Sequence, residues 1–179
     1  WLDGLDCLAA GVSLIISIFI LALSIMKGQP EPIIIASIVI GSCLGFLFHN
    51  SKKSYIFMGD SGSYFLGFNL AILSILASSS YPLQINKESY IVNIYTLLLV
   101  VALPVFDMTA VIFTRLKNGC SPFYPDRRHL HHRLIEIGFS QNESVLIIFS
   151  LTNWLSFLSI LILDFKNNYP YFIFSTFIL

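Results

Sequence analysis

The stretch LAAGVSLIISIFILALSIM at residues 8–26 decides the fold class, because its nineteen residues include no charged side chain. A helix needs about 20 mainly apolar residues to cross a bilayer. Similar runs recur along the chain, so the sequence predicts an all-α, polytopic integral membrane helix bundle. We expect five full spans and a truncated sixth, at roughly Leu8 to Met26, Ile33 to Phe48, Gly62 to Ser79, Tyr90 to Phe113, Ser144 to Leu163 and Tyr169 to Leu179.

The composition supports this class. Hydrophobic residues make up 56% of the 179 positions, and only 10 basic and 10 acidic side chains are present. A water-soluble domain would carry about a quarter charged residues, and buried soluble helices do not account for five such runs. The 16 Phe and 8 Tyr exclude a disordered chain. The zero net charge gives no indication of a nucleic-acid partner, and the three widely spaced cysteines form no disulfide framework.

Basic residues are distributed unequally between the two sides of the membrane. If the runs alternate in direction, one side carries seven and the other three, and an excess of Lys and Arg marks the cytoplasmic face. We therefore assign the seven-residue side to the cytoplasm. We expect residues 1–179 to form one integral domain that belongs to a longer protein, with N-terminal spans missing. The seven are Lys52, Lys53, Arg115, Lys117, Arg127, Arg128 and Arg133, and the three are Lys27, Lys87 and Lys166.

Carboxylates gather on the same side. The stretch DGLD at residues 3–6 has two carboxylates at a spacing that puts both on one face of a helix, although the helix dipole alone also favours them there. His49 and Asn50 end the second run, and MGDSGS at residues 58–63 leads into the third. Asp60 lies between Gly59 and Gly62, which let the backbone come close to a ligand, and its carboxylate is a hard oxygen donor suited to Mg²⁺. The alternative is a turn with a helix N-cap.

Two further groups lie near the same face. Asp107 is an ionisable residue inside an apolar run, which is costly at membrane depth; the alternative is a carboxylate that snorkels or pairs with Arg115. Residues 127–133 contain three Arg and three of the four His of the chain. Arginines can clamp phosphate oxygens. Zinc is less favoured, because these histidine spacings converge poorly on one tetrahedral ion.

Together these groups suit a Mg²⁺-bound diphosphate compound that meets a lipid-embedded partner. The residues alone leave two functions open: phosphoryl chemistry on a lipid, or recognition of an anionic headgroup.

The motifs resemble those of the polyprenyl-phosphate N-acetylhexosamine-1-phosphate transferases, over about the first three quarters of the chain. The matching stretches are DGLD with Leu8 and Ala9, residues 45–50, FMGDSGS with Leu66 and Gly67, residues 104–107 and residues 121–132. The approach to H-x-H-H is similar to the undecaprenyl-phosphate GlcNAc-1-phosphate transferase branch, and differs from the more distant phospho-N-acetylmuramoyl-pentapeptide transferase of peptidoglycan assembly.

The resemblance implies transfer of an N-acetylhexosamine-1-phosphate, with GlcNAc as the expected sugar, from a UDP-sugar to undecaprenyl or another polyprenyl phosphate. UMP is released, and Mg²⁺ or Mn²⁺ is the cofactor. The expected setting is the bacterial cytoplasmic membrane, in the initiation of a lipid-linked envelope glycan such as lipopolysaccharide or teichoic acid. The implied roles are a metal ligand (Asp60), nucleotide-site residues (Asp3, Asp6 and Asn50), a diphosphate-holding loop (Arg127, Arg128, His129, His131 and His132) and a position of unassigned role (Asp107).

Departures from the family pattern are also present. Cys7 stands where the family usually has Gly, and Lys53 where Pro is usual. The paired-aspartate motif D-D-x-x-D of the family is expected upstream of Trp1, so we expect residues 1–179 alone to be inactive. The alternatives are a non-catalytic membrane module or degenerate paralogue that binds a lipid phosphate, or the peptidoglycan-type transferase.

Overall fold

The computed structural model describes all residues except 1–3, 52–55, 79–86, 120, 122–128 and 168–179, with the backbone alone at 87–93 and 162–167. The described part is helical and contains no strand. Its elements are α1 (Leu8–Lys27), α2 (Pro30–Asn50), α3 (Gly59–Ser78), α4 (Lys87–Val100), α5 (Ala102–Lys117), α6 (Leu130–Ile137) and α7 (Gln141–Asn167).

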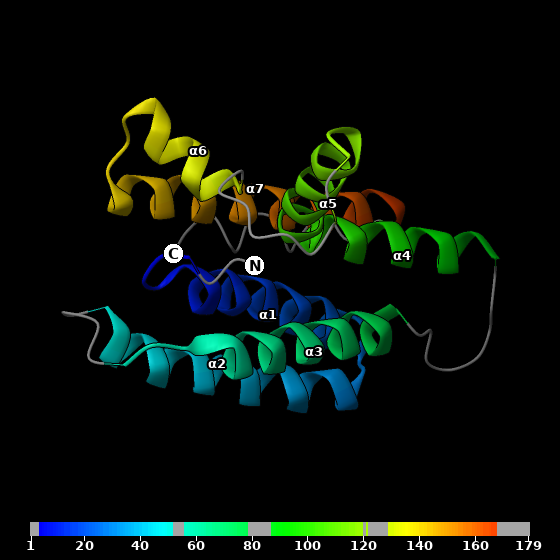
Figure 1. The fold of residues 1–179 in the computed structure, drawn as a ribbon. Helices are drawn as coiled ribbons and strands as arrows, with labels where there is room; N and C mark the ends of the chain where they lie inside the picture. The colour runs from blue at the N-terminus through cyan, green and yellow to red at the C-terminus, as the bar shows by residue number, and fades with distance from the viewer. Residues whose placement is uncertain (1–3, 52–55, 79–86, 120, 122–128, 168–179) are drawn as a thin grey trace.

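The central helix is α1, which packs against α2, α3, α4 and α7. Figure 1 shows α2 and α3 on one side of α1, and α4, α5, α6 and α7 on the other. Because α1 is surrounded, its apolar side chains form much of the core, including Leu8, Ile16 and Leu23, each with no exposed surface. The uncharged run at residues 8–26 therefore forms the middle of the bundle.

Local sequence signals set several helix ends. Helix α2 begins at Pro30, three residues before the predicted run that starts at Ile33. A proline suits this position because amides in the first helical turn need no intrahelical partner. Ser140 and Glu143 form a reciprocal capping box at the start of α7, with Ser140 N–H donating to Glu143 Oε2 at 2.8 Å. At the other end of the bundle, Lys27 Nζ donates to the Ala77 carbonyl at 2.9 Å and ties α1 to the last turn of α3.

Four of the five predicted full spans are confirmed as single helices long and apolar enough to cross a membrane, namely α1, α2, α3 and α7. The fourth run is not one straight span: Ile94–Val100 and Ala102–Lys117 meet at an angle of 74°. Pro104 accounts for the break, because proline fits the first turn of a new helix but would remove a bond from a continuous one. The sixth run lies outside the described residues.

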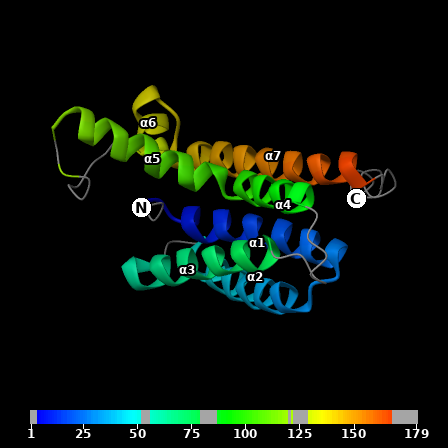
Figure 2. The same ribbon diagram turned by 90° about the vertical axis from the view of Figure 1, so that its right-hand side faces the viewer.

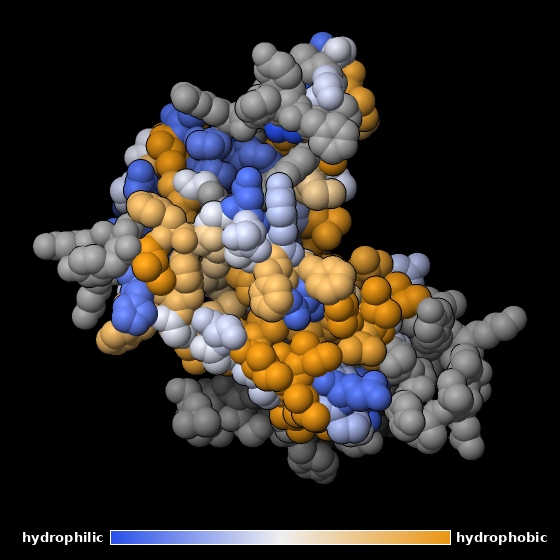
Figure 3. Space-filling model, turned by 60° about the horizontal axis from the view of Figure 1, so that its bottom comes forward, coloured by the Kyte–Doolittle hydropathy of each residue, from blue (hydrophilic) through white to orange (hydrophobic). Residues whose placement is uncertain are grey.

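The outer surface is strongly apolar. Figure 3 shows hydrophobic side chains gathered over much of one face. Exposed residues include Phe48, Phe68 and Phe113, each more than 60% accessible. A contiguous apolar surface of this kind is unfavourable in water and marks a membrane-facing region. The fold is therefore a membrane bundle, as the sequence predicts.

Candidate active site

The polar groups singled out in the sequence meet at one end of the bundle. The first turns of α1, α3 and α7 lie at this end together with α6 (Figure 2). The last turn of α2 joins them through a side-chain contact of Asn50. Three pairwise contacts connect the groups to one another.

Asn50 makes the first contact. It is 4% exposed, and its Oδ1 accepts a hydrogen bond from the Cys7 backbone N–H at 2.6 Å. Its Nδ2 donates to the Ile56 carbonyl at 2.8 Å. Both ends of the amide are therefore used to hold the start of α1 against the segment that leads into α3. Sequence reasoning assigned Asn50 to a nucleotide site and did not predict this structural role.

Cys7 itself adopts a left-handed backbone conformation, with φ of 67° and ψ of −13°, and caps α1. Among the described residues it is the single non-glycine with positive φ. Side chains with a Cβ are strained in this region, whereas glycine is not. The geometry gives the physical reason why a glycine suits this position, and why the cysteine at residue 7 is an informative departure.

The second contact joins Gly4 to His131. A Cβ added at Gly4 would overlap the His131 ring, so the DGLD segment can pack on the imidazole only through a glycine. His131 is 2% exposed, and neither ring nitrogen has a hydrogen-bond partner within the described part of the chain. Burial, followed by the neighbouring His132 and His129, lowers the pKa of His131 to about 4. The ring is consequently neutral at neutral pH.

The three histidines lie together. The rings of His129 and His131 are nearly parallel, with centroids 6.0 Å apart, and His132 lies 4.2 Å from His131 between ring centroids. His131 and His132 belong to α6, a short helix that the sequence analysis treated as a loop. The signal for it was present: Leu130 and Leu134 are four residues apart, both contact the core, and Gly138 ends the helix with φ of 114°.

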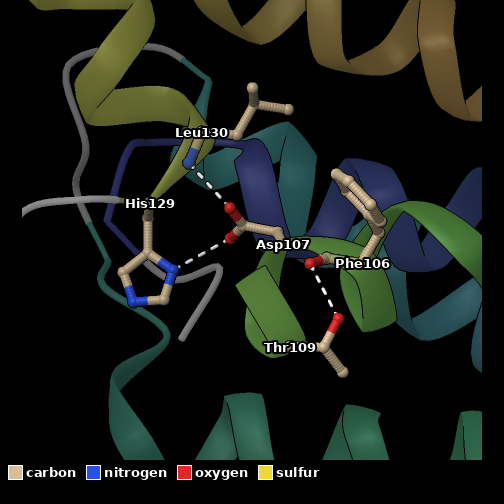
Figure 4. A network of polar contacts seen from close by, with 5 residues as sticks. All are labelled: Phe106, Asp107, Thr109, His129 and Leu130. Carbon is tan, nitrogen blue, oxygen red and sulfur yellow. Dashed lines mark hydrogen bonds and ion pairs between the residues drawn. The ribbon is translucent and has the colours of Figure 1, made fainter. Parts of the chain in front are cut away.

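The third contact connects α5 to α6 and is drawn in Figure 4. Asp107 Oδ2 lies 2.9 Å from His129 Nδ1, and Asp107 Oδ1 accepts a hydrogen bond from the Leu130 backbone N–H at 2.7 Å. Asp107 and His129 are 8% and 7% exposed. Of the alternatives weighed for Asp107, snorkelling toward water is wrong, because the carboxylate is buried against the histidine segment.

Cavities adjoin these contacts. One of about 320 Å³ is lined by residues at the start of α1, the end of α2 and the start of α3, including Asp6, Asn50 and Gly59. A second, of about 240 Å³, is a mainly apolar groove between α1, α3 and α5, and both Ser63 and Asp107 line it. A cavity with both polar and apolar lining and a mainly apolar groove thus lie at the end of the bundle that carries the histidines.

Asp60 lies in the first turn of α3, directly after Gly59, which has φ of 64°. Its side chain is exposed. Within the described ranges, no three His, Cys, Asp or Glu side chains come together as a metal-binding set. Mg²⁺ is commonly held by one or two carboxylates, with substrate phosphates and water as the other ligands, so an exposed Asp60 fits one protein ligand of such an ion.

Comparison with known proteins places the N-terminal part of the chain beside one family. Residues 1–78 match the family described as Glycosyl transferase family 4. The expected resemblance to polyprenyl-phosphate sugar-1-phosphate transferases is thereby confirmed.

Named relatives match most of the length of this chain. It is 37% identical over 176 residues to the "Probable undecaprenyl-phosphate N-acetylglucosaminyl 1-phosphate transferase" of Bacillus subtilis. It is 39% identical over 163 residues to the "Decaprenyl-phosphate N-acetylglucosaminephosphotransferase" of Mycobacterium leprae, and 30% identical over 150 residues to the "Undecaprenyl-phosphate alpha-N-acetylglucosaminyl 1-phosphate transferase" of Escherichia coli K12. These matches cover 90%, 83% and 82% of this chain, but 47%, 40% and 39% of the relatives.

The predicted site residues fall into two groups, those outside the described residues and those that the structure locates. Asp3, Arg127 and Arg128 lie outside the described residues. Asp6 lines the cavity of about 320 Å³, and His132 is partly exposed beside His131. The sequence analysis missed Gly4 and the Leu130 amide. A glycine next to a motif carboxylate was a signal for close packing, but a backbone amide carries no sequence signal.

Proposed function

We propose that the complete natural chain transfers GlcNAc-1-phosphate from UDP-GlcNAc to undecaprenyl phosphate or a similar polyprenyl phosphate. The observation that carries the proposal is the convergence of four motifs at one end of a membrane bundle. There, a cavity that Asp6 and Asn50 help to line lies close to a mainly apolar groove that Asp107 helps to line. A reaction between a water-soluble nucleotide sugar and a lipid needs such a pair of sites. The names of the relatives support an N-acetylglucosamine-1-phosphate donor and a polyprenyl phosphate acceptor.

The reaction joins two phosphates. An oxygen of the lipid phosphate attacks the β-phosphorus of the nucleotide sugar, and a new P–O bond forms there. The bond between the β-phosphorus and the bridging oxygen breaks, and UMP leaves with that oxygen. Catalysis of this kind depends mainly on positioning and charge neutralisation.

We assign the residues as follows. The cavity lined by Asp6 and Asn50 holds the nucleotide, and the apolar groove receives the first part of the polyprenyl chain. Asp3 is assigned to the nucleotide site as well. Arg127, Arg128, His129, His131 and His132 hold the diphosphate. Asp60 provides one ligand to Mg²⁺ or Mn²⁺, which when bound neutralises phosphate charge.

The site faces the cytoplasm in this proposal. Arg115, Lys117 and Arg133 support this orientation, since they lie on the histidine side of the bundle and basic residues concentrate on the cytoplasmic face. The expected setting is the bacterial cytoplasmic membrane, in the initiation of an envelope glycan. Residues 1–179 alone are expected to be inactive, because they correspond to less than half the length of the relatives.

The test is a transfer assay with the complete natural chain in detergent, labelled UDP-GlcNAc, undecaprenyl phosphate and Mg²⁺. Labelled lipid and UMP are expected, with loss of product on adding a chelator. Asp60→Asn should lower the rate by several orders of magnitude. The matched control is Glu31→Gln, an exposed carboxylate in the first turn of α2 at the opposite end of the bundle.

The alternative outcomes separate the candidate functions. An Asp60→Asn variant as active as Glu31→Gln would contradict the metal assignment. Binding of lipid phosphate without any transfer would support the non-catalytic module. Preference for UDP-MurNAc-pentapeptide would indicate the peptidoglycan-type reaction, preference for UDP-GalNAc would change only the sugar, and product from residues 1–179 alone would contradict the proposed inactivity.

A further inference from the structure

The two carboxylate oxygens of Asp107 contact two consecutive residues of another segment, His129 and Leu130. One oxygen contacts the His129 ring at Nδ1, and the other accepts the Leu130 amide. The other side-chain bond of this region in Figure 4, from Thr109 Oγ1 to the Phe106 carbonyl at 3.0 Å, stays within α5. Asp107 therefore provides a specific connection from α5 to the segment that carries the histidines.

The amide bond substitutes for a local helix cap. His129 is the N-cap residue of α6, with φ of −62° and ψ of 153°, and its own side chain makes no capping bond. The first amides of a helix have no intrahelical acceptor and are normally satisfied by the N-cap side chain. Here the Asp107 carboxylate supplies that acceptor from α5, so that the position of α6 depends on α5.

The ring contact fixes a tautomer. A carboxylate oxygen can only accept a hydrogen bond, so the His129 Nδ1 at 2.9 Å must carry the proton. The chemistry of His129 is then restricted to Nε2, on the far side of the ring from Asp107 (Figure 4). A carboxylate that orients a histidine in this way is a common arrangement in both metal sites and hydrolases.

We propose that Asp107 is a positioning residue of the transferase, which holds α6 and the Nδ1-protonated form of His129 so that Nε2 faces the reacting phosphates. The expected change in kcat rests on the proposed function. The expected tautomer of His129 does not. Asp107 itself acts through His129 and the start of α6.

The substitution Asp107→Asn separates the two contacts. Its carbonyl oxygen can still accept the Leu130 amide, but its NH₂ group then faces His129 Nδ1 and can only donate. The proton of the imidazole must move to Nε2 for this contact to persist. The variant therefore keeps the helix cap and reverses the tautomer.

Nitrogen NMR of the complete chain labelled with ¹⁵N-histidine measures this directly, with the His129 signal assigned by its loss in His129→Asn. We expect a protonated Nδ1 in the wild type and a bare Nδ1 in Asp107→Asn. A bare Nδ1 in the wild type would by itself overturn the inference. This readout does not require transfer activity, so it remains decisive if the proposed function is wrong.

The kinetic arm uses a double-mutant cycle in the transfer assay. Asp107→Asn should lower kcat about 10- to 100-fold, with the KM for UDP-GlcNAc nearly unchanged and a changed pH profile. In a His129→Asn background it should have no further effect. Glu136→Gln, an exposed carboxylate on α6 that lines the same cavity of about 470 Å³ as Asp107, is the matched control and should behave as wild type.

The outcomes distinguish the two proposals. Absence of transfer by the wild-type chain contradicts the proposed function alone. An active wild type combined with additive effects of Asp107→Asn and His129→Asn contradicts the positioning role alone. Equal losses of kcat in Asp107→Asn and Glu136→Gln would also contradict the positioning role, because the loss would then not depend on the contact with His129.

Discussion

Asn50 offers the sharpest test of how this end of the bundle is held together. Its amide accepts from the Cys7 N–H at 2.6 Å and donates to the Ile56 carbonyl at 2.8 Å, and the side chain is 4% exposed. Asn50→Ala removes both bonds and leaves a backbone donor and a backbone acceptor without their partner. Two neutral hydrogen bonds and the unsatisfied groups amount to about 2 to 3 kcal/mol.

The assay is thermal unfolding of the complete chain in detergent, followed by the loss of the monodisperse size-exclusion peak after heating. About 2 to 4 °C per kcal/mol for a domain of this size converts the estimate into a fall of roughly 4 to 12 °C. The melting temperature of Asn50→Asp should fall by a similar amount. The carboxylate can still accept the Cys7 N–H, but it cannot donate to the Ile56 carbonyl and repels that oxygen.

Asn69→Ala is the matched control. Asn69 is also an asparagine that donates to a backbone carbonyl, that of Phe65 at 2.8 Å, but this bond is exposed and lies within one helix. Its loss should change stability by less than about 0.5 kcal/mol. The reasoning would be refuted if Asn50→Ala and Asn69→Ala melted at the same temperature, or if Asn50→Asp were as stable as wild type.

Three further predictions follow from the same geometry. Cys7→Gly should stabilise the protein by about 0.5 to 1 kcal/mol by relieving the φ of 67°, whereas Cys7→Ala should not; a stabilised alanine variant would show that the thiol is responsible. The pKa of His131 is about 4 in the folded protein and near 6.5 when unfolded. The free energy of unfolding therefore keeps its full value above pH 6.5 and decreases as the pH falls toward 4, by up to about 3 kcal/mol, because the unfolded chain then binds a proton that the folded protein does not. Chemical unfolding across pH should show this slope weakened in His131→Gln and kept in His49→Gln, an exposed histidine; equal slopes in both would count against it. Gly11→Ala should lower the melting temperature by the equivalent of about 1 to 3 kcal/mol, since its Cβ would overlap the Phe149 ring, while Gly41→Ala, with open space around it, should not; equal melting of the two variants would contradict close packing of α1 on α7.

The membrane class and most of the span boundaries were predictable, because the length and polarity of a helix that crosses a bilayer are properties of one continuous segment. The run at residues 8–26 became α1 and the runs that begin near Ile33, Gly62 and Ser144 became α2, α3 and α7. The prediction was wrong where a run contained Pro104, because a local break of 74° leaves the hydropathy of the run unchanged. It also missed α6, where the signal was limited to Leu130, Leu134 and the terminating Gly138 because the helix has only eight residues.

The site residues were predictable as residue types but not as contacts. Sequence alone determined that carboxylates, an asparagine and histidines accumulate on one side of the membrane, because charge placement follows directly from the order of the apolar runs. Only the tertiary structure decided that Asn50 holds the backbone at Cys7, 43 residues away, and that Asp107 holds His129, 22 residues away. Such contacts depend on which helix faces pack together, and a hydrogen bond exists only where packing brings donor and acceptor within about 3 Å.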